Sequence, residues 1–485
     1  MELNQLKKIY FIGIGGIGMS ALARYFIGRG VEVHGYDKTE TVLTQALAAE
    51  GMKIHYTDDV SMIPPNVDLV IYTPAIKELA ELAQFKTRGV PILKRAEVLG
   101  VISRGMKCIG VAGTHGKTTT SSLLTHILRI GKVDATAFLG GISLSLGSNF
   151  VQGKSKWVVI EADEFDRSFH QLSPQMAIIT AADPDHLDIY GDAKSFREAF
   201  GLYQWRIKKK GICFTQANVK VLKPRGLWVS PEGAKQFNWG QFEETTYGLG
   251  KGKYKAVKVR VENGFFVFDY KSPKGDILNI KTTLPGEHNV ENAVAAIAVA
   301  QHIGVSAEAV KEALATFKGI RRRFEYIYRN EDKQVTFIDD YAHHPTELAA
   351  AIQAARTLYP NRRLIGIFQP HLFTRTRDFQ DGFSAALDTL DETVLMDIYP
   401  ARELPIEGIT SNMIVEKMKN PNVKRANKEN LMAILRGCFS DGHLENTTIL
   451  TLGAGDIDTF VKPIGALLAE IIEFDTDIGK CYKTH

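Results

Sequence analysis

The sequence predicts an α/β protein of three domains, each built on a largely parallel β-sheet. Its 485 residues are enough for three domains of about 150 residues each. Short apolar runs rich in β-branched residues alternate with longer helix-like runs along most of the chain, as in sheets covered by helices. Two of the apolar runs lead into glycine-rich turns, and a helix-like segment follows each turn.

The composition is typical of a soluble globular protein, with 45% hydrophobic and 24% charged residues. The net charge of +4 is too small for this length to indicate a nucleic-acid partner. Four scattered cysteines without a C-x-x-C pair favour a reducing cytoplasm over disulfides or a zinc site. We find no signal peptide and no apolar run long enough for a membrane span, so we expect a cytoplasmic protein without membrane insertion.

The first domain is expected over residues 1–105. Strand-like runs at Tyr10–Ile14, Val31–Tyr36 and Leu69–Tyr72 alternate with helix-like runs at Met19–Arg29 and Thr41–Glu50. This alternation predicts a parallel sheet with helices on its faces.

The glycine turn "GIGGIGM" lies between the first strand and the first helix of this domain. Its glycines would let the backbone approach a diphosphate at the positive end of the helix. The candidate contacts to such a nucleotide are Gly15, Gly16, Ile17, Gly18 and Asp37. The same turn occurs in NAD-dependent oxidoreductases, and a turn that only packs a strand against a helix would also use glycine.

The second domain is expected over residues 106–320 and begins with a strand, Cys108–Ala112, followed by "GTHGKTTT" and a helix. Backbone amides of such a loop bind phosphates, while Lys117 can bridge the β- and γ-phosphates and Thr118 can reach Mg²⁺. Val111 stands where the usual Walker spacing has glycine. The loop still predicts ATP binding, and its candidate contacts are Gly113, Thr114, His115, Gly116, Lys117, Thr118 and Thr119.

Two acidic clusters follow at the ends of the predicted strands Trp157–Ile160 and Met176–Thr180. Carboxylates and one imidazole beside a phosphate loop indicate Mg²⁺ sites. Surface charges or helix caps would give the same residues, and His186 could also be a buried histidine. The clusters contain Glu161, Asp163, Glu164, Asp166, Asp185, His186 and Asp188.

The segment 212–283 has short alternating runs, and Asn263-Gly264 is a good hairpin turn, so we expect an antiparallel excursion within the second domain. A helix rich in small apolar residues follows, "NVENAVAAIAVAQHIG". The third domain is expected over residues 321–485, with strands in "VTFIDDYA", "RLIGIFQP", "TVLMDIYP" and "TTILTLGAG".

Three polar segments of the third domain carry candidate site residues. Arg321–Arg323 lie at the predicted domain junction, where a guanidinium would suit a transferring phosphoryl group, although a solvated linker is the simpler alternative. "DDYAHHP" places two acids, Tyr341 and two histidines at a strand end. "FQPHLFTRTRDF" places His371, Arg375 and Arg377 at another strand end, which suits a carboxylate.

In this order and spacing, the motifs resemble those of the Mur ligases over nearly the whole chain. The motifs that carry the resemblance are "GIGGIGM", "GTHGKTTT", "EADEFD", "DHLDIY", "GEHNVENA", "RRRFE", "DDYAHHPTE", "FQPHLFTRTRDF" and "DIYPARE". The resemblance implies a Rossmann-like first domain for the UDP of UDP-N-acetylmuramic acid and a P-loop ATPase-like central domain for ATP and two Mg²⁺ ions. It further implies a Rossmann-like C-terminal domain that closes over both and brings the amino acid.

The resemblance also implies roles for matching residues. The metal ligands would be Thr118, Glu161 and His186. The adenine would lie near His288, Asn289 and Asn292, and the γ-phosphate near Arg322 or Arg323. The ribose and reacting phosphate would lie near Asp340, Tyr341 and His343, and L-alanine near Tyr341, His343, His371 and Arg375. The residues implied in catalysis are Lys117, Glu161, His186, Arg323, Asp340 and His343.

The implied reaction is ATP-dependent amide formation in peptidoglycan precursor synthesis, by a monomer or homodimer. The lactyl carboxylate would attack the γ-phosphate, and the alanine amine would displace phosphate from the acyl phosphate. Either His343 or His344 could take the amine proton. Two departures from the family pattern stand out. The stretch 196–206 holds no lysine that could be carbamylated, and Leu372 replaces an arginine common among relatives, which favours Arg375 as the carboxylate partner.

Three other functions compete with this one. A recycling ligase that joins UDP-N-acetylmuramate to a whole peptide shares the fold and the ATP site, but the segment His371–Arg377 is more similar to the alanine-adding members. An NAD-dependent oxidoreductase leaves the Gly-Lys-Thr loop unexplained. A non-catalytic binding protein would be expected to lose Lys117, Glu161 or His186, and all three are present.

Overall fold

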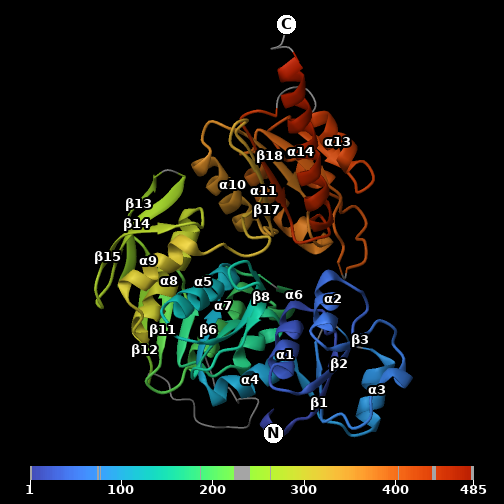
Figure 1. Ribbon diagram of the computed structural model, residues 1–485, viewed down its shortest axis with the longest axis vertical. Helices are drawn as coiled ribbons and strands as arrows, with labels where there is room; N and C mark the ends of the chain where they lie inside the picture. Colours follow the sequence, from blue (N-terminus) through green and yellow to red (C-terminus); the bar gives the residue numbers. More distant parts are fainter. Residues whose placement is uncertain are drawn as a thin grey trace. The chain divides into compact units, whose positions relative to one another are not determined.

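The computed structural model describes residues 3–73, 76, 78–185, 187–222, 241–262, 264–401, 403–439 and 444–481. Its three β-sheets have five, ten and six strands and pack against helices, which confirms the predicted α/β class (Figure 1). The chain divides into two compact units: one holds the first sheet and most of the second, and the other holds the third sheet together with the short segments Arg260–Phe266 and Thr282–His288. Among the residues described, no helix has both the length and the apolar character needed to cross a membrane.

The first sheet is entirely parallel, in the order β3-β2-β1-β4-β5. Its strands are β1 (Lys8–Ile12), β2 (Glu32–Tyr36), β3 (Lys53–His55), β4 (Leu69–Tyr72) and β5 (Ile92–Lys94). Its helices are α1 (Ile17–Ile27), α2 (Val42–Ala49), α3 (Ala80–Thr87) and α4 (Arg95–Gly105). Because β1 lies between β2 and β4, the glycine turn that follows β1 lies where the strand order reverses, the usual ligand position in such sheets.

The second sheet has the order β15-β14-β13-β12-β11-β10-β6-β9-β7-β8. Its strands are β6 (Lys107–Ala112), β7 (Thr136–Ser143), β8 (Ser148–Val151), β9 (Trp157–Ala162), β10 (Met176–Ile179), β11 (Ile212–Gln216), β12 (Glu243–Leu249), β13 (Tyr254–Glu262), β14 (Phe265–Lys271) and β15 (Ile277–Thr282). Its helices are α5 (Lys117–Ile130), the 3₁₀ segment η3 (Phe165–Gln171), α6 (Leu187–Tyr190), α7 (Ala193–Trp205), α8 (Glu287–Ile303) and α9 (Ala307–Thr316).

The antiparallel excursion begins later than the sequence predicts. Strand β11 pairs in parallel with both β10 and β12, so the parallel sheet continues past residue 212. Strands β13 and β14 are neighbours separated by only residues 263–264, a connection short enough only for an antiparallel hairpin. The predicted turn residue Asn263 itself lies outside the described residues.

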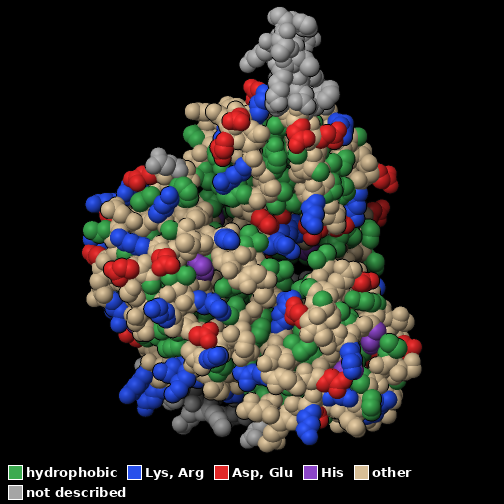
Figure 2. Space-filling view, viewed as in Figure 1, with side chains coloured by type: hydrophobic (Ala, Val, Ile, Leu, Met, Phe, Trp, Pro, Cys, Tyr) green, Lys and Arg blue, Asp and Glu red, His purple; other side chains and the backbone are tan. Residues whose placement is uncertain are grey.

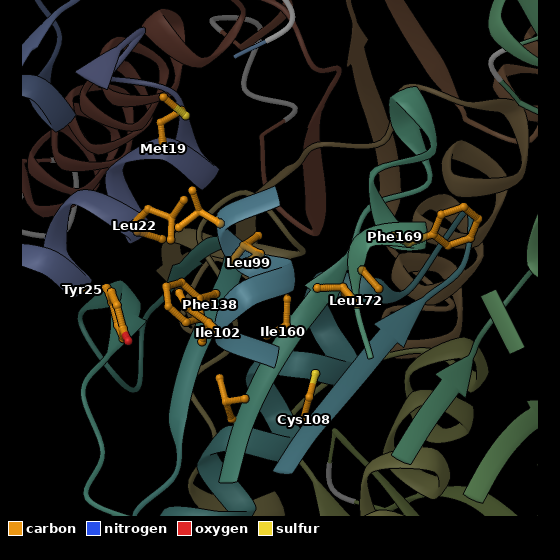
Figure 3. Close-up of a cluster of buried hydrophobic side chains, with 14 of the residues drawn as sticks. Met19, Leu22, Tyr25, Leu99, Ile102, Cys108, Phe138, Ile160, Phe169 and Leu172 are labelled. Carbon is orange, nitrogen blue, oxygen red and sulfur yellow. The ribbon is translucent and has the colours of Figure 1, made fainter. Parts of the chain in front are cut away.

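The first two sheets share one apolar core. The buried cluster that joins them includes Met19, Leu22 and Tyr25 of α1, Leu99 and Ile102 of α4, and Phe138 of β7 (Figure 3). The ring centroids of Tyr25 and Phe138 lie 5.5 Å apart, a favourable aromatic distance. Helix α1, which follows the glycine turn, is therefore packed against the central sheet.

The third sheet has the order β16-β17-β21-β18-β19-β20, with β16 antiparallel at one edge and the other pairs parallel. Its strands are β16 (Glu325–Asn330), β17 (Val335–Asp340), β18 (Arg363–Phe368), β19 (Glu392–Met396), β20 (Val423–Ala426) and β21 (Thr447–Leu452). Its helices are α10 (Pro345–Leu358), α11 (Phe373–Leu387), α12 (Asn412–Val415), α13 (Leu431–Phe439) and α14 (Asp458–Cys481). One apolar cluster includes residues of α10 and α11, and another includes residues of α13 and α14.

Charged side chains of both signs lie on the surface of the molecule (Figure 2). On the face drawn in Figure 2, acidic and basic side chains are interspersed over most of the surface.

Candidate active site

The loop between β6 and α5 has the shape of a phosphate cradle. Gly113 and Gly116 have φ angles of 141° and 78°, which disfavour any side chain. A Cβ on Gly113 would lie 2.0 Å from Thr180 Oγ1, and one on Gly116 would lie 2.5 Å from Asn292 Oδ1. The glycines therefore let the backbone turn tightly, and the loop ends at the positive N-terminus of α5.

Lys117 begins α5, and its ammonium group is held inside this loop. Lys117 Nζ donates to the Gly113 carbonyl oxygen at 2.6 Å and to the two Glu164 carboxylate oxygens at 2.9 and 2.6 Å. Burial alone would lower the pKa of Lys117, but the carboxylates of Glu164, Asp163 and Glu161 outweigh it and raise that pKa. Lys117 therefore stays charged, and an incoming phosphate would compete with Glu164 for the ammonium.

Glu161 lies beside the same loop at the end of β9. Its Oε1 accepts a hydrogen bond of 3.1 Å from Thr118 Oγ1, and its Oε2 accepts one of 2.9 Å from Gly140 N. Burial raises the pKa of Glu161. A carboxylate and a hydroxyl side by side next to a phosphate loop are oxygen ligands of the kind that Mg²⁺ prefers. These two residues therefore fit a magnesium ion.

The other predicted metal ligands give less support for a magnesium site. His186 lies outside the described residues. Asp163, Glu164 and Asp166 form ion pairs with Arg95, Lys117 and Lys94 respectively. Within the described ranges, no group of three or more His, Cys, Asp or Glu side chains could hold a metal ion. Three of the four "EADEFD" carboxylates are thus paired with basic side chains, which leaves Glu161 as the carboxylate of this segment that fits a metal ion best, and the metal site stays a prediction.

The remaining loop residues are tied to neighbouring elements. Thr114 Oγ1 accepts a hydrogen bond of 3.1 Å from Asp183 N, and His115 Nε2 lies 3.8 Å from Asp183 Oδ2. Thr119 is buried in the first turn of α5. Thr180, which sequence reasoning missed, donates to the carbonyl oxygens of Ala112 and His115. Its position at the end of β10, next to β6, is the signal that could have identified it.

Asn289 and Asn292 lie near the start of α8, and both are buried. Asn292 Oδ1 accepts a hydrogen bond of 3.2 Å from Thr120 Oγ1, and Asn292 Nδ2 donates to Asn289 Oδ1 at 3.3 Å. The structure thus connects these two predicted adenine contacts to the phosphate loop. His288, the third predicted adenine contact, is exposed at the start of the helix.

The glycine turn of the first domain is also closely packed. Gly16 is the residue that precedes α1, and Ile17 is exposed in its first turn. Asp37 Oδ2 accepts a hydrogen bond of 2.7 Å from Gly15 N. A Cβ on Gly18 would lie 2.0 Å from Arg95 Nη1. Asp37 therefore supports the turn, and its contact with a ribose stays a prediction.

In the second compact unit, Asp340 ends β17 and is buried. Its carboxylate accepts hydrogen bonds of 2.7 and 2.8 Å from the amides of Phe324 and Ala342. Burial raises the pKa of Asp340 to about 6, although the charge of Arg323 opposes this rise. Arg323 is thus close enough to Asp340 to favour its charged form, while the roles of both residues toward a nucleotide stay predictions.

The ring of Tyr341 lies near the guanidinium groups of both neighbouring arginines, with centroid distances of 5.2 Å for Arg322 and 5.1 Å for Arg323. Arg322 is held in the sheet, since it donates to Asp339 Oδ2 at 3.1 Å and to the Gly453 carbonyl oxygen at 2.7 Å. These distances allow favourable cation–π contacts that keep the predicted ribose and phosphate residues together.

His343, His371 and Arg375 form a second cluster in this unit. The rings of His343 and His371 lie 6.0 Å apart, and Arg375 Nη1 lies 3.3 Å from His371 Nδ1. Arg375 is buried although it is charged. His344, the other predicted base, instead caps α10, because its Nδ1 accepts a hydrogen bond of 3.3 Å from Thr346 N. His343 thus lies beside His371, whereas the ring of His344 packs against Phe379, with centroids 4.8 Å apart.

Comparison with known proteins places the chain in a family. Residues 8–107 match the model described as Mur ligase family, catalytic domain, residues 111–300 match the Mur ligase middle domain, and residues 322–455 match the Mur ligase, glutamate ligase domain. The UDP-N-acetylmuramate–L-alanine ligase of Flavobacterium psychrophilum is 45% identical over 475 residues, which cover 97% of this chain and all of the relative. The chain belongs to the Mur ligase family.

Solved Mur ligase structures share the architecture. UDP-N-acetylmuramate–alanine ligase MurC from Thermotoga maritima matches with a TM-score of 0.77 and 30% identity, over 97% of this Mur ligase and 99% of that chain. A MurF ligase from the same organism, in complex with ADP, matches with a TM-score of 0.60 and 13% identity, over 98% of this chain and 100% of that chain, which supports the fold alone. The resemblance and the three-sheet architecture predicted from sequence are therefore confirmed.

Proposed function

We propose that this Mur ligase joins L-alanine to the lactyl carboxylate of UDP-N-acetylmuramic acid and releases ADP and phosphate from ATP. The observation that carries the proposal is the full-length similarity, at 45% identity, to relatives named as UDP-N-acetylmuramate–L-alanine ligases. The phosphate loop around Lys117 and the His343–His371–Arg375 cluster supply the residue types that such a reaction needs. We place the reaction in the cytoplasm, where ATP and UDP-sugars are available.

The proposed division of labour follows the three sheets. Residues 1–105 would hold the UDP-sugar at the glycine turn, residues 106–320 would hold ATP, and residues 321–485 would hold the amino acid. The lactyl carboxylate and the γ-phosphate of ATP are both anions and must approach each other, so cations have to offset their charge. Lys117 would do this at the phosphates together with Arg323. When bound by Thr118 and Glu161, Mg²⁺ would neutralise further phosphate charge.

The chemistry would proceed in two displacements. A lactyl carboxylate oxygen attacks the γ-phosphorus, and the bond from that phosphorus to the ADP oxygen breaks, which gives an acyl phosphate. The alanine amine then attacks the acyl carbon, and the bond to the phosphate oxygen breaks. His343 would accept the proton that the amine loses, while Arg375 and His371 would hold the alanine carboxylate.

Phosphate release by the purified protein tests this function. We expect turnover only when ATP, UDP-N-acetylmuramic acid and an amino acid are all present. L-alanine should exceed glycine in kcat/KM by about tenfold or more, because one methyl group in a fitted pocket supports that discrimination. Equal turnover with glycine, L-serine or a tripeptide would contradict the alanine assignment. Turnover with the peptide alone would instead support the recycling ligase.

A further inference from the structure

Two consecutive basic residues, Lys94 and Arg95, connect the first sheet to the acidic segment that follows β9. They lie at the end of β5 and the start of α4. Arg95 Nη2 donates to Asp163 Oδ2 at 3.0 Å, and Lys94 Nζ donates to Asp166 Oδ2 at 3.1 Å. The proposed reaction gives neither basic residue a role.

Arg95 also contacts the glycine turn on its other side. A Cβ added to Gly18 would lie 2.0 Å from Arg95 Nη1 and 3.0 Å from its Cδ, so the guanidinium occupies the space directly above Gly18. The side chain is mostly buried, with 23% of its surface exposed, which keeps its ion pair with Asp163 partly shielded from water. One side chain therefore joins the turn of the proposed UDP-sugar site to the acidic segment.

The acidic segment in turn holds the ATP loop. Glu164, the neighbour of Asp163, binds Lys117 Nζ with both carboxylate oxygens. Asp163 also fixes the backbone that follows it, because its Oδ1 accepts a hydrogen bond of 3.1 Å from Phe165 N and its carbonyl oxygen one of 2.9 Å from Phe169 N. Asp163, which pairs with Arg95, is therefore directly adjacent in the chain to the residue that binds Lys117.

The body of α4 is fixed against the same segment. A Cβ on Gly100 would lie 2.6 Å from the Gln171 carbonyl oxygen, so the helix and the end of η3 approach each other closely. Ser173 N donates to Ser103 Oγ at 3.0 Å. The helix thus gives Arg95 a rigid base, and a rigid base is what precise positioning needs.

We propose that Arg95 is a positioning residue, whose ion pair with Asp163 sets the distance between the glycine turn and the Lys117 loop. This inference rests on the proposed function, in which the two loops hold the UDP-sugar and ATP. Arg95 would touch no reacting atom; it would keep the lactyl carboxylate in line with the γ-phosphate. A misplacement of about 1 Å can cost on the order of 10²-fold in rate, so loss of the pair should lower kcat strongly.

The test is a double-mutant cycle with Arg95→Gln and Asp163→Asn. We expect each single variant to lower kcat by roughly 10- to 100-fold, with the Kd of ATP and of UDP-N-acetylmuramic acid within about threefold of wild type. The double variant should be no slower than the slower single variant, because both remove the same interaction. Arg95→Lys should recover part of kcat. Lys253→Gln, which breaks an exposed ion pair of 3.3 Å with Glu243, serves as the matched control and should retain wild-type kcat.

Three results would overturn the proposal. The first is a double variant whose loss in kcat equals the product of the two single losses, since Arg95 and Asp163 would then act independently. The second is a Kd for UDP-N-acetylmuramic acid raised tenfold or more by Arg95→Gln but not by Asp163→Asn, since this would make Arg95 a direct ligand of the substrate. The third is loss of activity that follows a lower thermal unfolding midpoint and is not recovered by Arg95→Lys. The wild-type enzyme is assayed first, and the variants are then compared with whichever amino acid or peptide it uses. A wrong alanine assignment is therefore detected before the role of Arg95 is tested.

Discussion

Replacing Lys117 by alanine should lower the rate of ATP-dependent phosphate release by about 10³-fold or more, while UDP-N-acetylmuramic acid still binds. A cation that meets the transferring phosphoryl group contributes on this scale to phosphoryl transfer. Lys117 Nζ is held in the loop by Gly113 and Glu164, so the ammonium is already in place before ATP arrives. Phosphate release checks the rate, and isothermal titration calorimetry checks binding of the UDP-sugar.

The Lys117→Ala variant leaves the buried Glu164 carboxylate without its cation, and an unpaired buried charge destabilises the fold. The double variant Lys117→Ala/Glu164→Gln removes that charge and should regain thermal stability without regaining activity. The single variant Glu164→Gln keeps Lys117. It therefore separates the effect of losing the Glu164 charge from the effect of losing the ammonium group. Near-normal turnover by a folded variant that lacks Lys117 would show that this loop does not bind the reacting phosphate.

Replacing Arg375 by glutamine should raise the KM for L-alanine by roughly 10- to 100-fold, because a charge-assisted bond to a carboxylate contributes about 1.5–3 kcal/mol. Arg375 is buried beside His371, which suits a residue that holds a small anion out of water. The KM for ATP should stay within about twofold of the wild-type value. Steady-state kinetics with each substrate varied in turn measures both quantities.

Arg377 offers a matched control for Arg375. It lies two residues further along α11, but its side chain is exposed and pairs with Asp378 at 2.7 Å. We expect Arg377→Gln to leave the KM for L-alanine unchanged. Equal effects of the two substitutions would mean that the general charge of α11, rather than a contact by Arg375, determines alanine binding.

The glycine loops could be predicted from sequence because their chemistry is local. Gly113, Gly116 and Lys117 lie within five residues, and a strand, a tight turn and a helix are enough to place them. Partners distant in sequence could not be predicted this way. The ion pairs of Lys117 with Glu164 and of Arg95 with Asp163 depend on how β5, β6 and β9 are arranged in the folded unit.

The same distinction explains the differences in the fold. The strand β17 is fully buried, and its apolar run is enough to predict it. The edge strands β16 and β20 are partly exposed, and their charged residues hide the apolar pattern of a strand. The sequence predicts too early a start for the antiparallel excursion, because the alternation in residues 212–249 does not reveal whether a strand runs parallel to its neighbour. The choice of His343 over His344 likewise required the structure, which shows His344 as a helix cap.

The central claim is that the lactyl carboxylate itself attacks ATP. An isotope transfer experiment tests it most directly, with UDP-N-acetylmuramic acid labelled with ¹⁸O in both oxygens of that carboxylate. After turnover with unlabelled ATP and L-alanine, we expect the released phosphate to carry a single ¹⁸O atom and the amide carbonyl to keep the other, as mass spectrometry would show. Phosphate free of ¹⁸O would contradict an acyl phosphate intermediate.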